Sequence, residues 1–326
     1  MQLIYSDDSI CRIECLQKTY IVKSFKFNQI YVIQSLPVEY DDLGNEKKQT
    51  GEQLYDDLLK WQVYKHCLLT VHFEKISNRQ EWDALMKAIL QDCLDNGNIP
   101  LLHFEIHGAA TKDVFTPGFV LADGTLVGIE DIGQQLRAIN VATGFNLFIT
   151  LAVCKGMSLL LNMHLNEAMP FIGAIGSFYE LSEQDLLIRY MDFYTELFDS
   201  FDVAKAYIAL SNANPSMPVE YRYIPADELF IRNYQQYIDE QCSPEAIKKR
   251  ARDSEHLVSS QINNRADRRR FHKDFAKHEK LHRNYNYKAA IDHFFQLKTY
   301  PENVARFGIP TTIAELKEMS KRLLLV

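Results

Sequence analysis

The sequence predicts an α/β protein with a mainly parallel sheet, flanked by helices on both faces, and an additional helical region. Short β-branched and aromatic runs alternate with stretches of helical spacing, as at residues 30–36 and 51–61. Further strands are expected at residues 101–107 and 145–153. This alternation favours a parallel sheet, which carries its ligand and catalytic groups at the carboxyl ends of the strands.

The helices between these strands begin and end at recognisable residues. Asn78 is a favourable cap for a helix over residues 79–95, and Gly97 is a favourable terminator. A small hairpin is expected around Asp123 and Gly124. The other expected elements are a strand at residues 68–73, helices at 129–143, 182–198 and 203–212, and a strand within 168–176.

Changes in composition divide the chain into three parts. Residues 1–28 predict a β-hairpin, residues 29–220 the α/β domain, and residues 221–326 a helical extension. The second boundary is placed near residue 220 because helical periodicity dominates beyond Pro215 and Pro218.

The composition is that of a folded protein, with 47% hydrophobic and 24% charged residues. The first residues lack the pattern of a signal peptide, and the apolar run at 145–163 is interrupted around Lys155. The six cysteines form no Cys-x-x-Cys pair. We therefore expect a cytoplasmic protein without a membrane span, in which most thiols are buried and structural.

The strand at residues 101–107 alternates between apolar and polar residues. Its polar face carries His103, Glu105 and His107. His107 is followed by Gly108, which allows a ligand close to the backbone and leaves an N–H able to donate. The strand at 145–153 leads directly to Cys154, so a histidine base and a thiol nucleophile are expected at neighbouring strand ends.

These motifs resemble those of the caspase-like (clan CD) cysteine peptidases, particularly the bacterial caspase/separase-related (CHAT-type) group. In that family a strand ends in His-Gly, and roughly fifty residues later a strand ends in Ala-x-Cys-x-Gly or a similar motif. The segments Leu102-His-Phe-Glu-Ile-His-Gly and Leu151-Ala-Val-Cys-Lys-Gly fit this pattern, with His107 and Cys154 47 positions apart. The resemblance covers residues 28–215.

The resemblance implies a three-layer caspase-like fold and an endopeptidase that needs no metal or organic cofactor. Cys154 would attack the scissile carbonyl, His107 would shuttle a proton, and the N–H groups of Gly108 and Cys154 would form the oxyanion hole. It further implies a protein substrate, a regulatory protein partner, and a role in bacterial antiviral defence or cell death.

The substrate pocket departs from that of caspases. Ala152 stands two residues before the nucleophile, where caspases have a glutamine that helps bind aspartate, so aspartate specificity is not implied. The acidic residues Glu39, Asp41 and Asp42 follow the first core strand. They either attract a basic P1 side chain or form a solvated loop.

Two alternatives concern the polar face of residues 101–107. His103 and Glu105 either orient the His107 side chain or face a helix through satisfied hydrogen bonds. Together with His107 they could instead contribute to a metal site. Neighbours on one strand face lie ~7 Å apart, which disfavours one metal bound to all three, so no metal is expected.

The helical extension contains a basic stretch. Residues 245–288 hold thirteen Lys or Arg against six Asp or Glu. These helices could contact nucleic acid or another polyanion, although a solvated helix packed on acidic surface is the favoured interpretation. The second functional hypothesis is accordingly a catalytically silent caspase-fold module that binds a protein or nucleic acid through its basic C-terminal helices.

Overall fold

The computed structural model describes residues 4–5, 11–15, 18–22, 25–66, 68–109, 117–157, 167–214, 220–262 and 264–324, with only the backbone given before residue 25. The chain forms two compact units. The N-terminal unit contains Met1–His164 and Met169–Ala226, and the C-terminal unit contains Leu165–Ala168 and Asp227–Val326.

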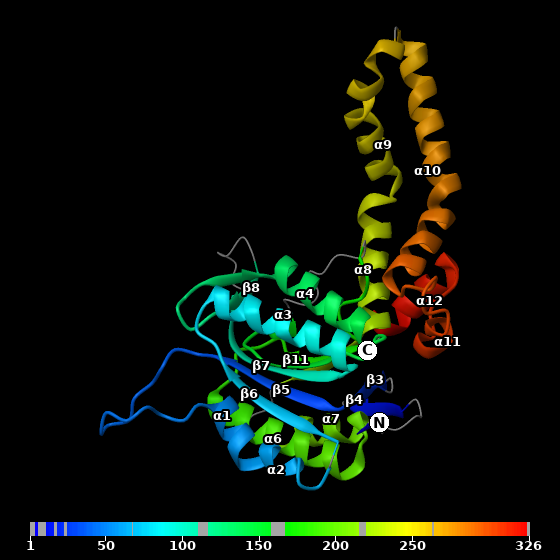
Figure 1. The fold of residues 1–326 in the computed structure, drawn as a ribbon. Coiled ribbons are helices and arrows are strands. Elements are labelled where there is room, and N and C mark those ends of the chain that lie inside the picture. Colours follow the sequence, from blue (N-terminus) through cyan, green and yellow to red (C-terminus); the bar gives the residue numbers. More distant parts are fainter. Residues whose placement is uncertain are drawn as a thin grey trace. The chain divides into compact units, whose positions relative to one another are not determined.

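A mixed, mostly parallel sheet forms the centre of the N-terminal unit (Figure 1). Its main path has the order β12-β11-β10-β7-β5-β6, in which β12 is antiparallel to β11 and the other neighbours are parallel. The predicted α/β class is therefore confirmed. The strands are β5 (Gln29–Ser35), β6 (Thr70–Lys75), β7 (Pro100–Ala109), β10 (Phe148–Ala152), β11 (Gly173–Ser177) and β12 (Tyr221–Pro225).

Helices cover both faces of this sheet, which gives three layers (Figure 1). On one face, Trp82 of α3 lies 5.9 Å from Phe104 of β7 between ring centroids. On the other, the ring of Tyr190 in α6 lies 4.7 Å from that of His103. The first face carries α3 (Arg79–Asn96) and α4 (Ile129–Ala142); the second carries α1 (Thr50–Leu54), the π-helical turn η1 (Tyr55–Leu59), α2 (Lys60–Gln62), α6 (Glu183–Ser200) and α7 (Val203–Asn212).

Local sequence signals explain where these helices begin and end. The side chain of Asn78 accepts a hydrogen bond from the N–H of Glu81 at 3.0 Å and caps α3. Gly97 ends α3 in the left-handed region, at φ 65°, which a residue without a side chain adopts readily. Ser182 caps α6 in the same way as Asn78 caps α3, through the N–H of Asp185.

The first residues of the chain join the N-terminal unit. β2 (Cys11–Cys15) and β3 (Lys18–Val22) form an antiparallel pair, as the sequence predicts, and β1 (Ile4–Tyr5) pairs with β4 (Lys26–Phe27). Phe25 is buried and stacks on Phe148 with ring centroids 4.5 Å apart. The expected boundary at residue 28 therefore falls within a continuous core.

The helical region begins later than expected. Residues 221–225 form the edge strand β12 and not part of a helical extension, because Tyr221, Tyr223 and Ile224 are buried residues of strand-forming types. The next helix, α8 (Ala226–Gln241), then begins directly after Pro225. The boundary between the two compact units accordingly follows Ala226.

The C-terminal unit is helical in its described residues, and α9 and α10 lie side by side as an arm (Figure 1). Phe230, Tyr287 and Phe294 are among the buried aromatic residues that form its core. No helix in the described ranges is both long enough and apolar enough to cross a membrane. After α8 the elements are α9 (Pro244–Asp253), the 3-10 helix η2 (Glu255–Gln261), α10 (Arg265–Phe294), α11 (Asn303–Phe307) and α12 (Ile313–Leu324).

A buried ion pair within α6 also binds the end of α7 through the arginine. The Nε of Arg189 donates to both carboxylate oxygens of Asp185, at 2.9 and 2.8 Å, and both side chains are almost fully buried. The guanidinium group also donates to the carbonyls of Leu210 and Ser211, at 2.9 and 3.1 Å. Several hydrogen bonds therefore offset the cost of burying this charge.

We predict that Arg189→Met lowers the free energy of unfolding by about 3–5 kcal/mol, because it leaves the Asp185 carboxylate buried without its cation. Urea denaturation of the full chain measures this loss. Arg79→Met is the matched control, since Arg79 pairs with Asp83 and Asp131 in partly exposed positions and should cost about 1 kcal/mol or less. Equal losses in the two variants would contradict the role assigned to Arg189.

Candidate active site

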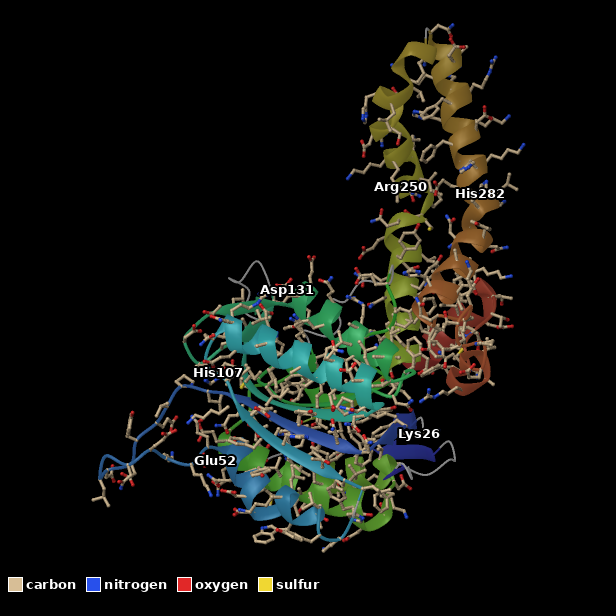
Figure 2. The ribbon with its side chains drawn as sticks, in the orientation of Figure 1. Lys26, Glu52, His107, Asp131, Arg250 and His282 are labelled. Atoms are coloured by element: carbon tan, nitrogen blue, oxygen red, sulfur yellow. The ribbon has the colours of Figure 1, made fainter. Side chains whose placement is uncertain are left out.

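The β-ladder brings His107 and Cys154 to neighbouring strand ends. β7 and β10 pair in parallel from Leu101↔Phe148 to Glu105↔Ala152, so partners differ by 47 positions throughout. His107 and Cys154 differ by the same number, two residues beyond the last pair. In Figure 2, His107 lies where the sheet strands end. The two residues that the sequence selects therefore both lie at the carboxyl edge of the sheet, just beyond the paired parts of adjacent strands.

Gly108 makes a close contact with the backbone of Cys154. A β-carbon placed on Gly108 would lie 2.1 Å from the carbonyl oxygen of Cys154 and 3.0 Å from a methyl group of Val153. Distances this short are not tolerated, so a side chain at this position would push the two strand ends apart. Glycine after His107 thus allows the histidine strand and the cysteine turn to approach each other.

β7 continues where β10 has ended. Beyond Glu105, its residues His107 to Ala109 pair antiparallel with β8 (Gly118–Val120), which in turn pairs with β9 (Leu126–Gly128). His107 itself pairs with Val120, and its side chain is exposed. The small β8–β9 hairpin, predicted around Asp123 and Gly124, thereby holds the backbone of His107 while its imidazole remains accessible.

The turn after β10 holds the Cys154 thiol partly exposed. Its sulfur accepts the backbone N–H of Leu181 at 3.4 Å and lies 3.8 Å from the Leu181 carbonyl oxygen, to which the S–H donates. The next residue, Lys155, has a left-handed backbone with φ 57°, which is unusual for a residue with a side chain. Such local strain persists only where neighbouring contacts support it.

The segment 178–181, after β11, supplies that support. The N–H of Lys155 donates to the Tyr179 carbonyl at 3.0 Å, and its ammonium group pairs with Glu180 at 2.9 Å. Within the described ranges no carbonyl outside the β-ladder accepts the N–H of Cys154. This N–H belongs to the nucleophile of the expected site and is one of the two donors assigned to the oxyanion hole.

His103 and Glu105 form a separate buried network. His103 hydrogen-bonds Thr150 at 2.8 Å through Nδ1 and Glu105 at 3.2 Å through Nε2. Thr50, the first residue of α1, donates its hydroxyl to the other Glu105 oxygen at 2.8 Å. Among the described contacts neither residue hydrogen-bonds His107. The geometry favours satisfied hydrogen bonds toward the helices over direct orientation of His107.

The acidic residues after β5 lie on an exposed loop. Asp41 accepts hydrogen bonds from the backbone N–H groups of Asn45 and Leu43, at 2.8 and 2.9 Å. The bonds from the backbone and side chain of Asn45 hold the pKa of Asp41 below its usual value. Glu39 pairs with Lys47 at 3.3 Å, and Asp42 is exposed. Within the described contacts, none of these carboxylates touches His107, Cys154 or Ala152.

The described residues give no support to a metal site, and the described cysteines other than Cys154 lie outside the candidate site. No group of three His, Cys, Asp or Glu side chains in the described ranges is arranged to hold a metal ion. Cys93 is buried, and burial raises the pKa of its thiol to about 12. The side chains of Cys11 and Cys15 and all of Cys67 lie outside the described parts, while Cys242 is partly exposed.

No family model matches the chain, and no curated protein matches it. Any function must therefore be supported by the residues and the geometry of the site.

The contact between Cys154 and residues 178–181 could not be found by motif. Leu181 and Tyr179 act through backbone groups, which every residue type carries, so their side chains give no signal. The left-handed conformation of Lys155 was equally hidden, since glycine would be the expected residue there.

We predict that Gly108→Ala displaces the Cys154 turn and destabilises the chain by about 1–3 kcal/mol, because the new methyl group overlaps the Cys154 carbonyl. Thermal unfolding and the rate of Cys154 alkylation measure the two effects. The control is Gly133→Ala in α4, where the nearest atom, at 3.1 Å, belongs to the flexible Arg137 side chain. If the two variants behave alike, the proposed close contact is wrong.

We also predict that alkylation distinguishes the cysteines. Because the pKa of Cys93 is raised to about 12, its thiol stays protonated in the folded protein at pH 8 and should resist iodoacetamide. Cys154 and Cys242 are partly exposed and should react. Mass spectrometry of tryptic peptides gives the site of each adduct. Denaturant should make Cys93 reactive, and rapid native labelling of Cys93 would contradict its burial.

Proposed function

We propose that this chain is a caspase-like cysteine endopeptidase with Cys154 as the nucleophile and His107 as its general base. The observation that carries the proposal is the meeting of His107-Gly108 with Cys154 at the carboxyl ends of adjacent parallel strands. A nucleophilic thiol requires partial exposure and a nearby base; the Cys154 thiol is partly exposed, and the proposal assigns the exposed His107 imidazole as its base.

The topology of the sheet supports the same location. β5, the first of these strands along the chain, lies between β6 and β7, so the chain goes from β5 to β6 on one side and then continues through β7, β10 and β11 on the other. In open α/β sheets, ligands bind outside the carboxyl ends of the strands at such a switch point. His107 lies just beyond the part of β7 that pairs with β5, and Cys154 follows the next strand, β10. A three-layer caspase-like fold is part of the proposal.

In the proposed reaction His107 removes the proton from the Cys154 thiol, and the sulfur attacks the scissile carbonyl carbon. The N–H groups of Gly108 and Cys154 donate to the oxygen that becomes negatively charged. His107 then returns the proton to the departing amine, which leaves an acyl group on sulfur. Water, deprotonated by His107, hydrolyses this thioester and restores the free thiol.

The contact between Cys154 and Leu181 has a consequence for this reaction. The sulfur now faces the Leu181 backbone, and no hydrogen bond joins it to His107 among the described contacts. Productive binding therefore requires the thiol to turn toward His107. The same observation favours a second candidate, a catalytically silent interaction module, in which Leu181 holds the thiol permanently.

We predict that peptidyl electrophiles modify Cys154 selectively, and that His107→Ala slows this modification by about 10²–10⁴-fold, because it removes the general base. The experiment compares a basic with an acidic P1 group, and Cys154→Ala identifies the adduct by mass spectrometry. Two matched controls, Cys242→Ala and His282→Ala, remove a partly exposed thiol and an exposed imidazole on the C-terminal unit. Both should leave modification of Cys154 unchanged.

Preference for the basic probe would favour a basic P1 residue in the protein substrate. If His107→Ala and His282→Ala react as fast as the unaltered chain, the dyad is wrong. Equal and slow modification of Cys154 and Cys242 would instead favour the silent module.

A further inference from the structure

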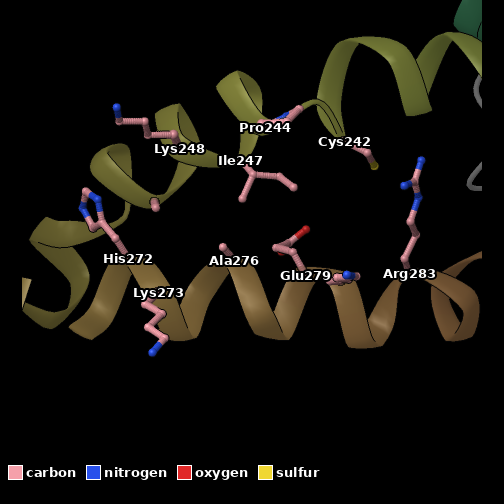
Figure 3. Close-up of a pocket in the computed structure, with 11 residues that line it drawn as sticks. Cys242, Pro244, Ile247, Lys248, His272, Lys273, Ala276, Glu279 and Arg283 are labelled. Carbon is pink, nitrogen blue, oxygen red and sulfur yellow. The ribbon is translucent and has the colours of Figure 1, made fainter. Parts of the chain in front are cut away.

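The arm of the C-terminal unit contains a cavity between α9 and α10 (Figure 3). Its volume is about 520 Å³, within the range of sites that hold small ligands or a few side chains. Ile247 and Ala251 of α9 and Ala276 of α10 supply apolar lining. The two helices thus leave apolar surface between them that small alanine side chains do not fill.

The lining of the cavity continues a face of α10 that is buried elsewhere. Ala276, Lys280, Tyr287 and Ile291 follow one another at helical spacing. Tyr287 and Ile291 pack in the core of the C-terminal unit, whereas Ala276 and Lys280 border the cavity. The same helix face is therefore covered at one end and open at the other, which indicates a place for additional apolar groups.

The charge around this cavity is positive. Lys248, Lys273 and Lys280 belong to its lining and have no acidic partner among the described residues. In Figure 3 the side chains of Lys248 and Lys273 point outward from its edge. The acidic lining residue, Glu279, is already paired with Arg250 at 2.7 Å. An occupant that combines apolar side chains with carboxylates would satisfy both the apolar lining and the unpaired lysines.

The loop between β5 and α1 has this combination of side chains. Val38, Tyr40 and Leu43 are 46%, 68% and 86% exposed. Large apolar side chains that are grouped and exposed in this way often mark an interaction site. Glu39 and Asp42 lie among them and are exposed too. These residues, with Asp41, make up the segment 38–43, which we name the acidic loop tip.

The acidic loop tip has a defined conformation. The N–H of Asp41 donates to the Asn45 carbonyl at 2.9 Å, and the N–H of Gly44 donates to the Asp41 carbonyl at 2.9 Å. A bridge between Tyr40 and Glu46 closes the turn. Because the turn is already formed, docking would order few additional residues, which lowers the entropic cost of binding.

We propose that the acidic loop tip of one copy of this chain docks into the α9–α10 cavity of a second copy. Tyr40 and Leu43 enter the apolar lining, and Glu39 and Asp42 approach the lysines at its edge. The contact is heterologous, because one copy contributes its loop and the other its cavity. A pair joined by one such contact still has one free loop and one free cavity. Further copies can therefore add until a ring closes. Salt should weaken the contact, since its charges lie at exposed positions.

The test is a complementation experiment with full-length variants. The loop variant is Tyr40→Ser with Leu43→Ser, and the cavity variant is Lys273→Glu with Lys280→Glu. We expect the unaltered chain to self-associate in sedimentation velocity as its concentration rises, and each variant alone to do so at least about tenfold more weakly. An equimolar mixture should form a one-to-one dimer, because the loop variant has an intact cavity and the cavity variant an intact loop.

Matched controls change similar residues elsewhere. Leu94→Ser removes a 61% exposed leucine from α3, and Lys317→Glu with Lys321→Glu reverses two exposed lysines of α12. Both should associate like the unaltered chain. A further variant carries Glu39→Lys and Asp42→Lys in its loop. Its loop should bind the cavity of the Lys273→Glu, Lys280→Glu variant, because both members of each charge pair are then reversed.

Several results would overturn the proposal. A chain that stays monomeric at its highest soluble concentration has no such contact. If the loop variant and the cavity variant each still self-associate like the unaltered chain, the association uses another surface. If the mixture forms no dimer although each variant alone has lost association, the loop and cavity do not meet between copies. Loss of association in the Leu94→Ser control would mean that general apolar exposure drives it.

Discussion

The parallel register between β7 and β10 is the constraint on which the candidate site depends. Main-chain hydrogen bonds between the strands fix which residues stand side by side, and a slip by one residue would turn every side chain to the opposite face. The contact between Gly108 and the Cys154 carbonyl then sets how closely the strand ends approach. Residues 178–181 hold the cysteine turn from its other side.

A buried polar network lies behind these strand ends, on the face of the sheet that α1 and α6 cover. It runs from Thr50 through Glu105 and His103 to Thr150, and the Thr150 hydroxyl hydrogen-bonds Tyr194 of α6 at 3.0 Å. Burial raises the pKa of Tyr194, so its hydroxyl stays protonated. Because these polar groups would be costly without partners, the network favours one arrangement of α1, β7, β10 and α6.

Much of this structure could be predicted because it depends on local patterns. The Asn78 cap and the strand–helix alternation predicted the layers, and polar residues on an otherwise buried strand pointed to His107. The edge strand at Tyr221–Pro225 was missed because prolines precede it and helices follow. The partners of His103 and the contact of Leu181 with Cys154 depend on tertiary packing and backbone groups, which no spacing along the chain encodes.

The pairing of β7 with β10 places His107 and Cys154 side by side whatever the number of residues between them. Between β7 and β10 the described part of the chain passes through β8, β9 and α4. Residues could be inserted or deleted in the loops of this segment while the histidine and the cysteine kept their neighbouring places. The interval of 47 positions is therefore a measure of loop length in this particular chain. Distant homologues should be sought by strand context, with the interval free to vary.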